Sequence, residues 1–318
     1  MYTYVITGAT GYIGSQLIQR IVMEDKSPNI IVLVRNLDKA RETLPSFINF
    51  IQLDLTDTNA MASLQLECDY IIHCATVTNS SEMIAHPVEV TQSIINTTQN
   101  VLELARRCSI KSMVYLSSME VYGDINCSYG SRVSETELGN IDILNTRSCY
   151  PLGKRMAENI CYSYYKEYGI PVKIARLAQT FGRGILPTDN RVFAQFARAA
   201  RDGKNIVLNT KGNSMGNYCG MEDAIAGIMT ILVHGTDGEA YNVVNEVNTM
   251  TIRQMAELVC NEISGGKIVV EYDIPKENPL GFAPDTGLRL SGQKLEALGW
   301  KPRKHLLDMY KDLIADMR

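Results

Sequence analysis

The sequence lacks both a charge excess and a long hydrophobic segment. Its 318 residues carry 31 Lys and Arg against 35 Asp and Glu, a formal net charge of −4, so its charge does not favour a nucleic acid or an anionic membrane surface. The longest apolar run, AIAGIMTILV at 224–233, is half of the roughly 20 residues that a membrane-spanning helix needs, and it predicts a buried helix. The N-terminus, MYTYVITG, shows no signal-peptide pattern. We therefore expect neither nucleic acid nor membrane among the partners.

Disulfide and metal-binding patterns are also absent. The eight cysteines are scattered and contain no CxxC pair, in a chain long enough to build its core without disulfides. The four histidines, at positions 73, 86, 234 and 305, lack the spacing of metal ligands. We expect reduced, mostly buried thiols, a cytoplasmic location and no bound metal.

A glycine-rich turn near the N-terminus predicts a dinucleotide site. The strand-like YVIT is followed by GATGYIG and then by apolar residues at helical spacing. In this context Gly8 permits a tight turn, Gly11 lets the backbone approach a pyrophosphate, and Gly14 lets the helix pack closely. The alternative is a structural turn in an unrelated α/β protein. The cofactor-binding residues expected here are Gly8, Thr10, Gly11, Tyr12, Ile13 and Gly14.

The end of the second predicted strand, NIIVLV at 29–34, bears on the choice of cofactor. A dinucleotide fold usually has an acidic residue here to hold the ribose hydroxyls, but this chain has Arg35 followed by Asn36. A guanidinium cannot accept from a hydroxyl, whereas it matches a 2′-phosphate well. Arg35 and Asn36 therefore favour NADP over NAD. The alternative is that Arg35 faces solvent and NAD is held elsewhere.

Strands and helices continue to alternate along the first half of the chain. FINFIQLDL, DYIIHCAT and SMVYLSS read as strands, and residues 90–108 read as a helix. This alternation predicts an α/β fold with a Rossmann-type doubly wound parallel sheet. Ligands bind such sheets beyond the carboxyl ends of the strands, so the residues there should converge on one crevice. Those expected at the cofactor are Asp54, Leu55, Cys74 and Ala75, with His73, Ser117 and Ser118 beside them.

The stretch RSCYPLGKRMAE at 147–158 adds two chemical groups to this crevice. Tyr150 and Lys154 are four residues apart, so on a helix they lie on the same face. A phenol, with a pKa near 10, is a poor base at neutral pH, but a nearby ammonium and a nicotinamide cation both favour the phenolate. A Ser118 hydroxyl could hold a substrate oxygen during proton transfer. Together with the glycine turn, these residues predict an alcohol–ketone redox site beside a nicotinamide.

In combination these motifs resemble the extended short-chain dehydrogenase/reductase family, and more narrowly its NAD(P)-dependent epimerases and dehydratases of nucleotide sugars. The resemblance is carried by GATGYIG, Asp54-Leu55, SSMEVYG at 117–123, YPLGK at 150–154, RLAQTFGRG at 176–184 and KLEALGWKP at 294–302. It implies a catalytic triad of Ser118, Tyr150 and Lys154, with Tyr150 as the acid/base, and it also places Tyr150 and Lys154 at the cofactor.

The resemblance also implies a division into domains. Residues 1–178 plus about 220–250 would form the dinucleotide-binding domain, to which a strand at 241–245 returns. Residues 179–219 plus 251–318 would form a smaller C-terminal α/β domain that binds a nucleotide sugar. The oligomeric state is left open, with a homodimer among the alternatives.

The sequence departs from the family pattern at several positions. IINTT stands at 94–98 where members commonly carry NVxGT, and Gln179 stands where an Asn is usual. Gly216 occupies the place of an arginine that commonly binds the substrate diphosphate, and Arg183 or Arg289 could replace that arginine. The substrate contacts expected are Thr76, Ser117, Gln179, Arg183, Arg191 and Arg289, with solvated surface as the alternative for the three arginines.

Three functions remain open. The first is an epimerase or dehydratase that oxidises a sugar carbon and later returns the hydride, usually with NAD. The second is a net NADPH-dependent reductase of a keto-sugar, and the third is a non-catalytic NADP-sensing module. If the strand continues to Ser118, alternation places Glu120 on the same face, where the dehydratases that this segment resembles have a catalytic base. Met119, however, cannot donate a proton as their usual Asp does, so we expect epimerisation or reduction rather than 4,6-dehydration.

Overall fold

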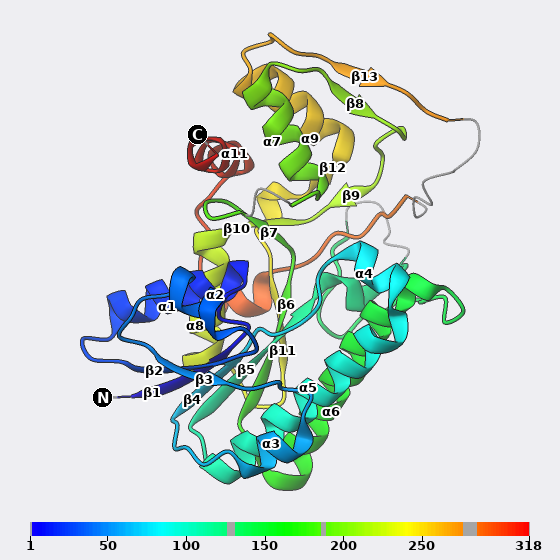
Figure 1. The fold of residues 1–318 in the computed structure, drawn as a ribbon. Helices are drawn as coiled ribbons and strands as arrows, with labels where there is room; N and C mark the ends of the chain where they lie inside the picture. The colour runs from blue at the N-terminus through cyan, green and yellow to red at the C-terminus, as the bar shows by residue number, and fades with distance from the viewer. Residues whose placement is uncertain (1, 126–130, 186–188, 276–284, 318) are drawn as a thin grey trace.

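The computed structural model describes residues 2–125, 131–185, 189–275 and 285–317. Within these ranges, seven parallel strands form a central sheet in the order β11-β6-β5-β4-β1-β2-β3 (Figure 1). The strands are β1 (Thr3–Thr7), β2 (Asn29–Val34), β3 (Asn49–Gln52), β4 (Tyr70–His73), β5 (Ser112–Ser118), β6 (Val172–Leu177) and β11 (Ala240–Val243). The doubly wound parallel sheet expected from the sequence is confirmed.

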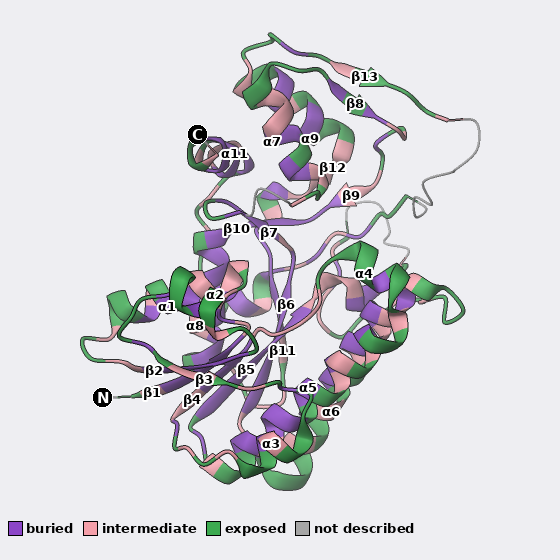
Figure 2. Cartoon of the chain, viewed as in Figure 1, coloured by how far each residue is buried: buried purple, intermediate pink, exposed green. Residues whose placement is uncertain are grey.

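The strands are apolar along most of their length because helices cover both faces of the sheet. β6 is buried at every position, and β2 is buried at every position after Asn29. In Figure 2 the strands are largely buried apart from the edge strand β3, and the exposed residues lie on the loops and the outer sides of the helices. The helices on one face are α1 (Tyr12–Glu24), α2 (Leu37–Thr43) and α8 (Met221–His234); those on the other are α3 (Thr58–Ser63), α5 (Pro87–Cys108) and α6 (Cys149–Tyr168).

The apolar run at 224–233 forms most of α8, which packs against β5 and β6 as the expected buried helix. No helix in the described ranges is both long and apolar enough to cross a membrane. α5 begins at Pro87, where the missing N–H of proline leaves no helical bond unmade. It ends where Ser109 turns into the left-handed region at φ 50°.

A second group of elements lies beyond the carboxyl ends of the strands, in the upper part of Figure 1. Its core is a separate apolar cluster that includes Phe181, Phe193, Met255 and Tyr310. Phe181 stacks on Phe193 with ring centroids 4.3 Å apart. The helical elements are α7 (Val192–Asp202), α9 (Ile252–Leu258), the π-helical turn η4 (Val259–Ile263) and α11 (Leu306–Asp316); the strands are β7 (Gln179–Phe181), β8 (Ile206–Leu208), β9 (Met215–Gly216), β10 (Tyr218–Gly220), β12 (Met250–Thr251) and β13 (Val270–Tyr272).

The segment around α10 (Gln293–Glu296) does not follow the expected division of the chain. We expect residues 251–318 in the smaller domain, yet Leu290, Leu295 and Trp300 belong to the apolar core on the α1 and α8 face of the sheet. The Trp300 indole donates to the Asp223 carbonyl oxygen at 2.9 Å, which fixes this segment on α8. The chain therefore returns to the larger sheet before it forms α11, and the two-domain division elsewhere stays a prediction.

The strand order also determines where the crevice lies. β1 pairs with β2 on one side and with β4 on the other, so the direction in which strands are added reverses at β1. In such sheets the loops after the two central strands separate and leave a ligand crevice at the carboxyl edge. The remaining short elements are α4 (Ser80–Ala85), η1 (Met119–Tyr122), η2 (Thr146–Ser148) and η3 (Glu246–Asn248).

Candidate active site

The glycine turn between β1 and α1 has a shape that side chains would not allow. Gly8 has φ 67°, and a Cβ there would lie 2.8 Å from the backbone nitrogen of Ala75. A Cβ on Gly14 would overlap the Gly8 carbonyl oxygen, so α1 packs against the turn only because Gly14 has no side chain. Gly11 is exposed and precedes the first turn of α1. These features fit a backbone cradle for a dinucleotide pyrophosphate at a helix N-terminus.

The adjoining ends of β1 and β4 are fastened together by Thr7. Its Oγ1 lies 2.7 Å from Nδ1 of His73 and accepts from the Ala75 N–H at 3.2 Å. Burial lowers the pKa of His73 to about 3, and the charge of Lys154 adds to the fall, so the ring is neutral. The 74–75 segment therefore closes one side of the glycine turn. Thr76, which follows it, has a buried Oγ1 with no hydrogen-bond partner among the described residues.

Two residues of the glycine turn point away from the cradle. The Tyr12 hydroxyl donates to the Gly182 carbonyl oxygen at 2.9 Å, and its ring packs between the sheet core and the core around Phe181. Burial raises the pKa of Tyr12, with Arg191 opposing the rise. Ile13 packs on the core next to the sheet, while Thr10 is half-buried. For Tyr12 and Ile13 the backbone N–H is thus the group left to face a phosphate.

Arg35, after β2, and Asp54, after β3, lie close enough for the charge of one to act on the other. Arg35 is exposed directly after β2. The Thr56 N–H lowers the pKa of Asp54 more than burial raises it, and Arg35 contributes to the fall. Asn36 uses its side chain to cap α2 by accepting from the Lys39 N–H at 2.9 Å.

The loop that carries Asp54 is fastened to α5. Leu55 is buried, and its carbonyl oxygen accepts from Asn100 of α5 at 2.8 Å.

The three expected catalytic residues meet where β5 ends and α6 begins. Ser118 is the last residue of β5, and Tyr150 and Lys154 occupy the first two turns of α6. The Lys154 Nζ donates to the Leu116 carbonyl oxygen at 2.8 Å and lies 5.9 Å from the centroid of the Tyr150 ring. Its side chain is 1% exposed, and this burial lowers its pKa from 10.5 to about 8.

The Tyr150 phenol is subject to opposing influences. Burial raises its pKa and Glu120 adds to the rise, whereas a hydrogen bond with Ser118 and the charges of Arg147 and Arg191 oppose it. A bound cation beside the phenol would lower the pKa of Tyr150, as these arginines do.

Cys74 lies between the glycine turn and Lys154, because its backbone lies against Gly8 and its thiol is within range of the Lys154 charge. Burial raises the pKa of that thiol to about 12, so Cys74 is a neutral wall of the crevice.

Glu120 lies in a turn and not on the strand from which its position was predicted. The strand stops at Ser118 and the chain enters the 3₁₀ turn η1, so strand alternation does not apply to Glu120. The Ser118 Oγ accepts from the Glu120 N–H at 3.2 Å. Met119 is half-buried and packs against the core of the sheet.

The partner of Glu120 is Arg147, which the sequence analysis does not identify. The Glu120 carboxylate pairs with the Arg147 guanidinium at 2.9 Å, and that guanidinium lies 5.6 Å from the Tyr150 ring centroid. The signal available in the sequence is the position of Arg147 three residues before Tyr150.

The expected substrate residues are not all in the crevice. Ser117 is buried and its hydroxyl donates to Glu158 at 2.5 Å, so a substrate contact is not supported for it. Arg183 is 65% exposed and pairs with Asp312 at 3.4 Å on the outer surface, and a crevice role is not supported there either. Arg191 pairs with Asp189 and its charge reaches both Tyr12 and Tyr150, so it lies over the crevice.

Gln179 and Gly216 lie in the second group of elements, whereas Arg289 stands between Leu288 and Leu290 of the core beside the sheet. Gln179 begins β7, and its N–H donates to the Asn217 carbonyl oxygen at 2.9 Å. The Arg289 carbonyl oxygen accepts from the Val133 N–H at 2.7 Å. A Cβ on Gly216 would overlap the Tyr218 hydroxyl, so any larger residue there requires the tyrosine to move.

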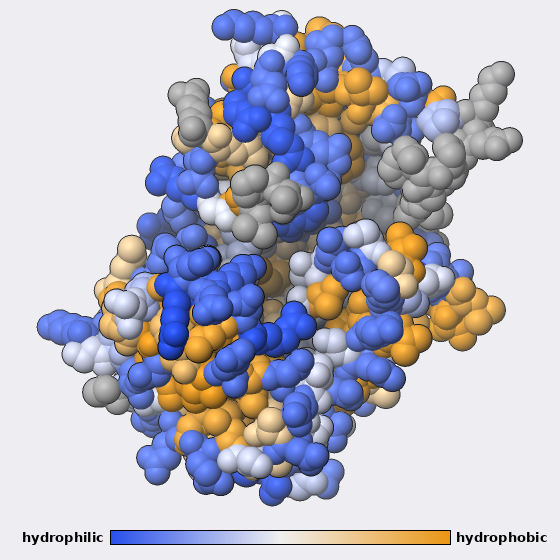
Figure 3. Space-filling view, in the orientation of Figure 1, coloured by the Kyte–Doolittle hydropathy of each residue, from blue (hydrophilic) through white to orange (hydrophobic). Residues whose placement is uncertain are grey.

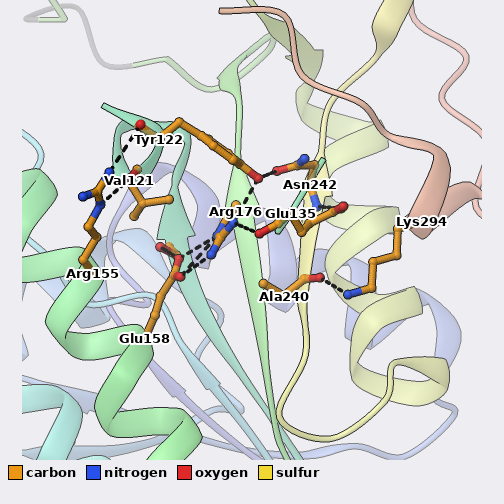
Figure 4. A network of polar contacts seen from close by, with 10 residues as sticks. Val121, Tyr122, Glu135, Arg155, Glu158, Arg176, Ala240, Asn242 and Lys294 are labelled. Atoms are coloured by element: carbon orange, nitrogen blue, oxygen red, sulfur yellow. Dashed lines mark hydrogen bonds and ion pairs between the residues drawn. The ribbon is translucent and has the colours of Figure 1, made fainter. Parts of the chain in front are cut away.

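A buried polar network around Glu158 and Arg176 was also missed (Figure 4). The Glu158 carboxylate pairs with the Arg176 guanidinium at 2.7 Å. Arg176 also donates to the Tyr122 hydroxyl at 3.0 Å, and that hydroxyl donates to Asn242 at 2.7 Å. The signal in the sequence is Glu158, one helical turn after Lys154, and an arginine inside an apolar strand, where a charge requires a partner.

Comparisons with known proteins find similar chains. Residues 4–244 match the family model described as the NAD dependent epimerase/dehydratase family. UDP-glucuronic acid decarboxylase 5 of Arabidopsis thaliana is 28% identical over 314 residues, which cover 99% of this chain and 89% of that protein. The UDP-glucose 4-epimerase of Thermotoga maritima, solved with UDP-glucose, has a TM-score of 0.84 at 21% identity and covers 99% of this chain and 98% of its own. The Thermus thermophilus UDP-glucose 4-epimerase, solved with NAD, has a TM-score of 0.83 at 22% identity, covering 99% of both chains.

Proposed function

Because this chain belongs to the NAD dependent epimerase/dehydratase family, we propose that it uses a nicotinamide dinucleotide to oxidise a carbinol carbon of a nucleotide-linked sugar to a ketone. The observation that carries the proposal is the arrangement of Ser118, Tyr150 and Lys154 beside the glycine turn. Cys74 connects the two, since it lies against Gly8 and within range of Lys154. Acid–base groups and a turn that would hold a nicotinamide dinucleotide therefore lie at one crevice.

The residues that would hold the cofactor are those of the cradle and its two ends. The Gly8–Gly14 turn would hold the pyrophosphate, Arg35 the adenosine end, and Tyr150 and Lys154 the nicotinamide end. When bound, the nicotinamide supplies a hydride acceptor and a positive charge. The positive charge would lower the pKa of the Tyr150 phenol, which burial raises in the protein alone.

The protein's own residues then carry the proton transfer. Tyr150 takes the proton of the substrate hydroxyl as the carbon–oxygen bond becomes a carbonyl, and it returns that proton when the ketone is reduced again. Ser118 donates a hydrogen bond to the same substrate oxygen and keeps it near the phenol. Lys154 stays close to the Tyr150 ring and stabilises the phenolate electrostatically.

The test is to incubate the protein with NAD⁺ or NADP⁺ and a panel of nucleotide-linked hexoses and uronic acids, and to identify the products by mass spectrometry and NMR. We expect conversion of at least one sugar, and turnover lower by about 10²-fold or more in the Tyr150→Phe variant. Failure to bind or convert any member of the panel, by protein shown to bind a nicotinamide dinucleotide, would contradict the proposal.

The cofactor is proposed to be NADP(H) rather than NAD(H). Arg35 supports this choice, because it stands exposed at the strand end where an acidic residue would hold the ribose hydroxyls. Fluorescence titration with NADPH and NADH tests it on the wild type, on Arg35→Asp, and on Lys39→Asp as a matched control. We expect Arg35→Asp alone to weaken NADPH binding by about tenfold or more, the effect of one hydrogen bond to a charged group. Tighter binding of NADH by the wild type would contradict this choice.

A second candidate, decarboxylation of a nucleotide-linked uronic acid, is favoured by one observation. The Arg147 guanidinium lies beside Tyr150 and is paired with Glu120, so a cation is available near the carbon that would be oxidised. A ketone next to the carbon that bears a carboxylate allows carbon dioxide to leave with its bonding electrons retained as an enolate, which is then protonated. The relatives named UDP-glucuronic acid decarboxylases support the same substrate class.

The same panel separates the candidates. Decarboxylation of UDP-glucuronate gives a pentose product that has lost one carbon dioxide, whereas epimerisation keeps the mass and net reduction consumes NADPH. We do not expect a 4-keto-6-deoxy sugar, since Met119 cannot donate a proton. Efficient formation of that product, abolished by Glu120→Gln, would show that the chain is a dehydratase.

We also propose that the protein forms a homodimer through the α5 and α6 side. A groove of about 670 Å³ lies between these helices, and beside it Ile143 and Leu144 are 73% and 91% exposed. Figure 3 shows hydrophobic residues gathered on that side of the molecule. Light scattering on the wild type and on Leu144→Asp tests the proposal, and a monomeric wild type would contradict it. The cytoplasmic location expected from the sequence stays a prediction.

A further inference from the structure

One buried carboxylate contacts both elements that carry the expected catalytic residues. Glu158 lies one turn after Lys154 on α6, so its backbone moves with that of the lysine. The Ser117 hydroxyl donates to the Glu158 Oε1 at 2.5 Å. Ser117 directly precedes Ser118 at the end of β5. A single side chain therefore bridges the helix with Lys154 to the strand with Ser118.

The other side of this carboxylate is held by Arg176 of β6. The guanidinium donates to both oxygens of Glu158, with its Nε at 3.0 Å and 3.2 Å and its Nη2 at 2.7 Å. Its Nη1 donates to the Tyr122 hydroxyl at 3.0 Å. Tyr122 ends the η1 turn that carries Glu120. The network thus reaches the segments on either side of Ser118 (Figure 4).

Tyr122 continues the network to the edge of the sheet. Its hydroxyl donates to Asn242 Oδ1 of β11 at 2.7 Å, and the Asn242 N–H donates to the Glu135 carboxylate at 2.8 Å. Arg155, on the same helix as Glu158, donates to the Val121 carbonyl oxygen at 2.7 Å. Buried networks in which each group has a partner fix one arrangement of the elements they join.

The Lys154 ammonium depends on this network for part of its charge balance. Burial lowers the pKa of Lys154, and the charge of Glu158 is the largest influence that opposes the fall. A counter-charge is needed there because an unpaired buried ammonium is strongly disfavoured. The ionisable groups that face Lys154 from the elements around it are His73, Cys74, Tyr115, Tyr150, Glu158 and Cys161.

We propose that Glu158 is a positioning residue of this active site, which holds the end of β5 against α6 and supplies the counter-charge of Lys154. Arg176 holds the Glu158 carboxylate in place and partly neutralises its negative charge. The inference rests on the proposed function for the roles of Ser118 and Lys154. Its electrostatic part concerns the cofactor-free protein and can be tested without substrate.

The experiment is an NMR titration of Lys154 in protein labelled with ¹³C at the lysine ε-carbon. The Lys154 signal is assigned from its loss in Lys154→Met, and we expect its midpoint in the wild type at about 8. Glu158→Gln should lower that midpoint by roughly half a pH unit or more, because the counter-charge is lost. Arg176→Gln should raise it, because Glu158 is then less neutralised.

Two further variants keep the experiment decisive. Glu167→Gln makes the same change at an exposed position of α6 and should leave the midpoint unmoved. If Glu158→Gln does not fold, Glu158→Gln with Arg176→Gln removes both buried charges, a replacement that proteins tolerate better than the loss of one. We expect a lowered Lys154 midpoint in this double variant too.

A Lys154 midpoint that stays at its wild-type value in a folded Glu158→Gln or double variant would overturn the proposal. Activity provides a separate reading. On a substrate found with the panel above, Ser117→Ala should lower kcat several-fold with KM nearly unchanged, because the hydroxyl faces Glu158 rather than the crevice. If the panel yields no substrate, the proposed function fails while the titration still decides the role of Glu158.

Discussion

Lys154 shows how much of the site's chemistry depends on the burial of one side chain. Its ammonium is held by the Leu116 carbonyl oxygen and lies 4.7 Å from the centroid of the Tyr115 ring. Burial lowers its pKa from 10.5 in the unfolded chain to about 8 in the folded protein. The folded state therefore releases this proton at a lower pH than the unfolded state does.

This difference predicts a change in stability with pH. Below about pH 8 the lysine is charged in both states, and its burial lowers the free energy of unfolding. Between pH 8 and 10.5 the unfolded state holds more protons, so stability rises with pH. Relative to that of Lys154→Met, the free energy of unfolding of the wild type should increase by about 3 kcal/mol between pH 7 and pH 10.5. Urea unfolding of both proteins at several pH values measures this, and a constant difference would contradict it.

Tyr150 is the residue on which the proposed chemistry depends most directly. Tyr150→Phe removes one hydroxyl and leaves the buried ring in place, so we expect the variant to fold and to bind the dinucleotide. Turnover should fall by about 10²-fold or more, the usual contribution of a general acid–base group. Tyr162→Phe, at a more exposed position of the same helix, is the matched control. Turnover of Tyr150→Phe within a few-fold of the wild type would assign the proton transfer to another group.

The contact between α1 and the glycine turn depends on a missing side chain. α1 approaches so closely that a Cβ on Gly14 would overlap the Gly8 carbonyl oxygen and lie 2.8 Å from the Cα of Ala9. Both are backbone groups, which cannot rotate away as a flexible side chain can. The position of the helix N-terminus at the cradle therefore requires glycine at 14.

Gly14→Ala should shift α1 and widen the turn. We expect a loss of about 1–3 kcal/mol in the free energy of unfolding, typical of overpacking, together with weaker dinucleotide binding. Gly287→Ala, where an added Cβ meets open space, should change neither. Differential scanning calorimetry and NADPH titration make the two measurements. Wild-type binding by a Gly14→Ala protein would mean that the cradle is not at this turn.

The whole molecule joins two groups of elements across the crevice. Tyr12 at the start of α1 donates to Gly182, and Asp223 of α8 accepts from the Lys304 N–H at 2.8 Å. These contacts tie α1 and α8 to the segments around Gly182 and Lys304. Arg191, at the N-terminus of α7, lies over the crevice.

We therefore expect the substrate to contact segments on the side of the crevice opposite the sheet. We expect substrate to slow hydrogen exchange in residues 180–191 and 209–221, of which 186–188 lie outside the described residues. The exposed helix α2 should show no change in exchange, because it packs on the same face of the sheet as α1 and α8. Exchange mass spectrometry with and without a converted nucleotide sugar tests this. Unchanged exchange in both segments would contradict it.

Local patterns were enough to identify much of this protein. The strand β5 at 112–118 and the buried helix at 224–233 follow from runs of apolar residues, and the glycine turn follows from its spacing. Tyr150 and Lys154 share a helix face because four residues are close to one turn. These features depend on neighbours in the chain, so the sequence by itself determined the fold class and the glycine turn at the crevice.

The features that the sequence did not determine depend on residues far apart in the chain. Ser117 and Ser118 are adjacent and both polar, yet their hydroxyls meet different residues of α6: Ser117 donates to Glu158, whereas Ser118 is hydrogen-bonded with Tyr150. Glu120 enters the site because the strand ends at Ser118. The pairing of Glu158 with Arg176, and the return of Trp300 to α8, bring together residues 18 and 77 positions apart. Only the tertiary structure decided these contacts, since they arise from burial and charge pairing after the elements have packed.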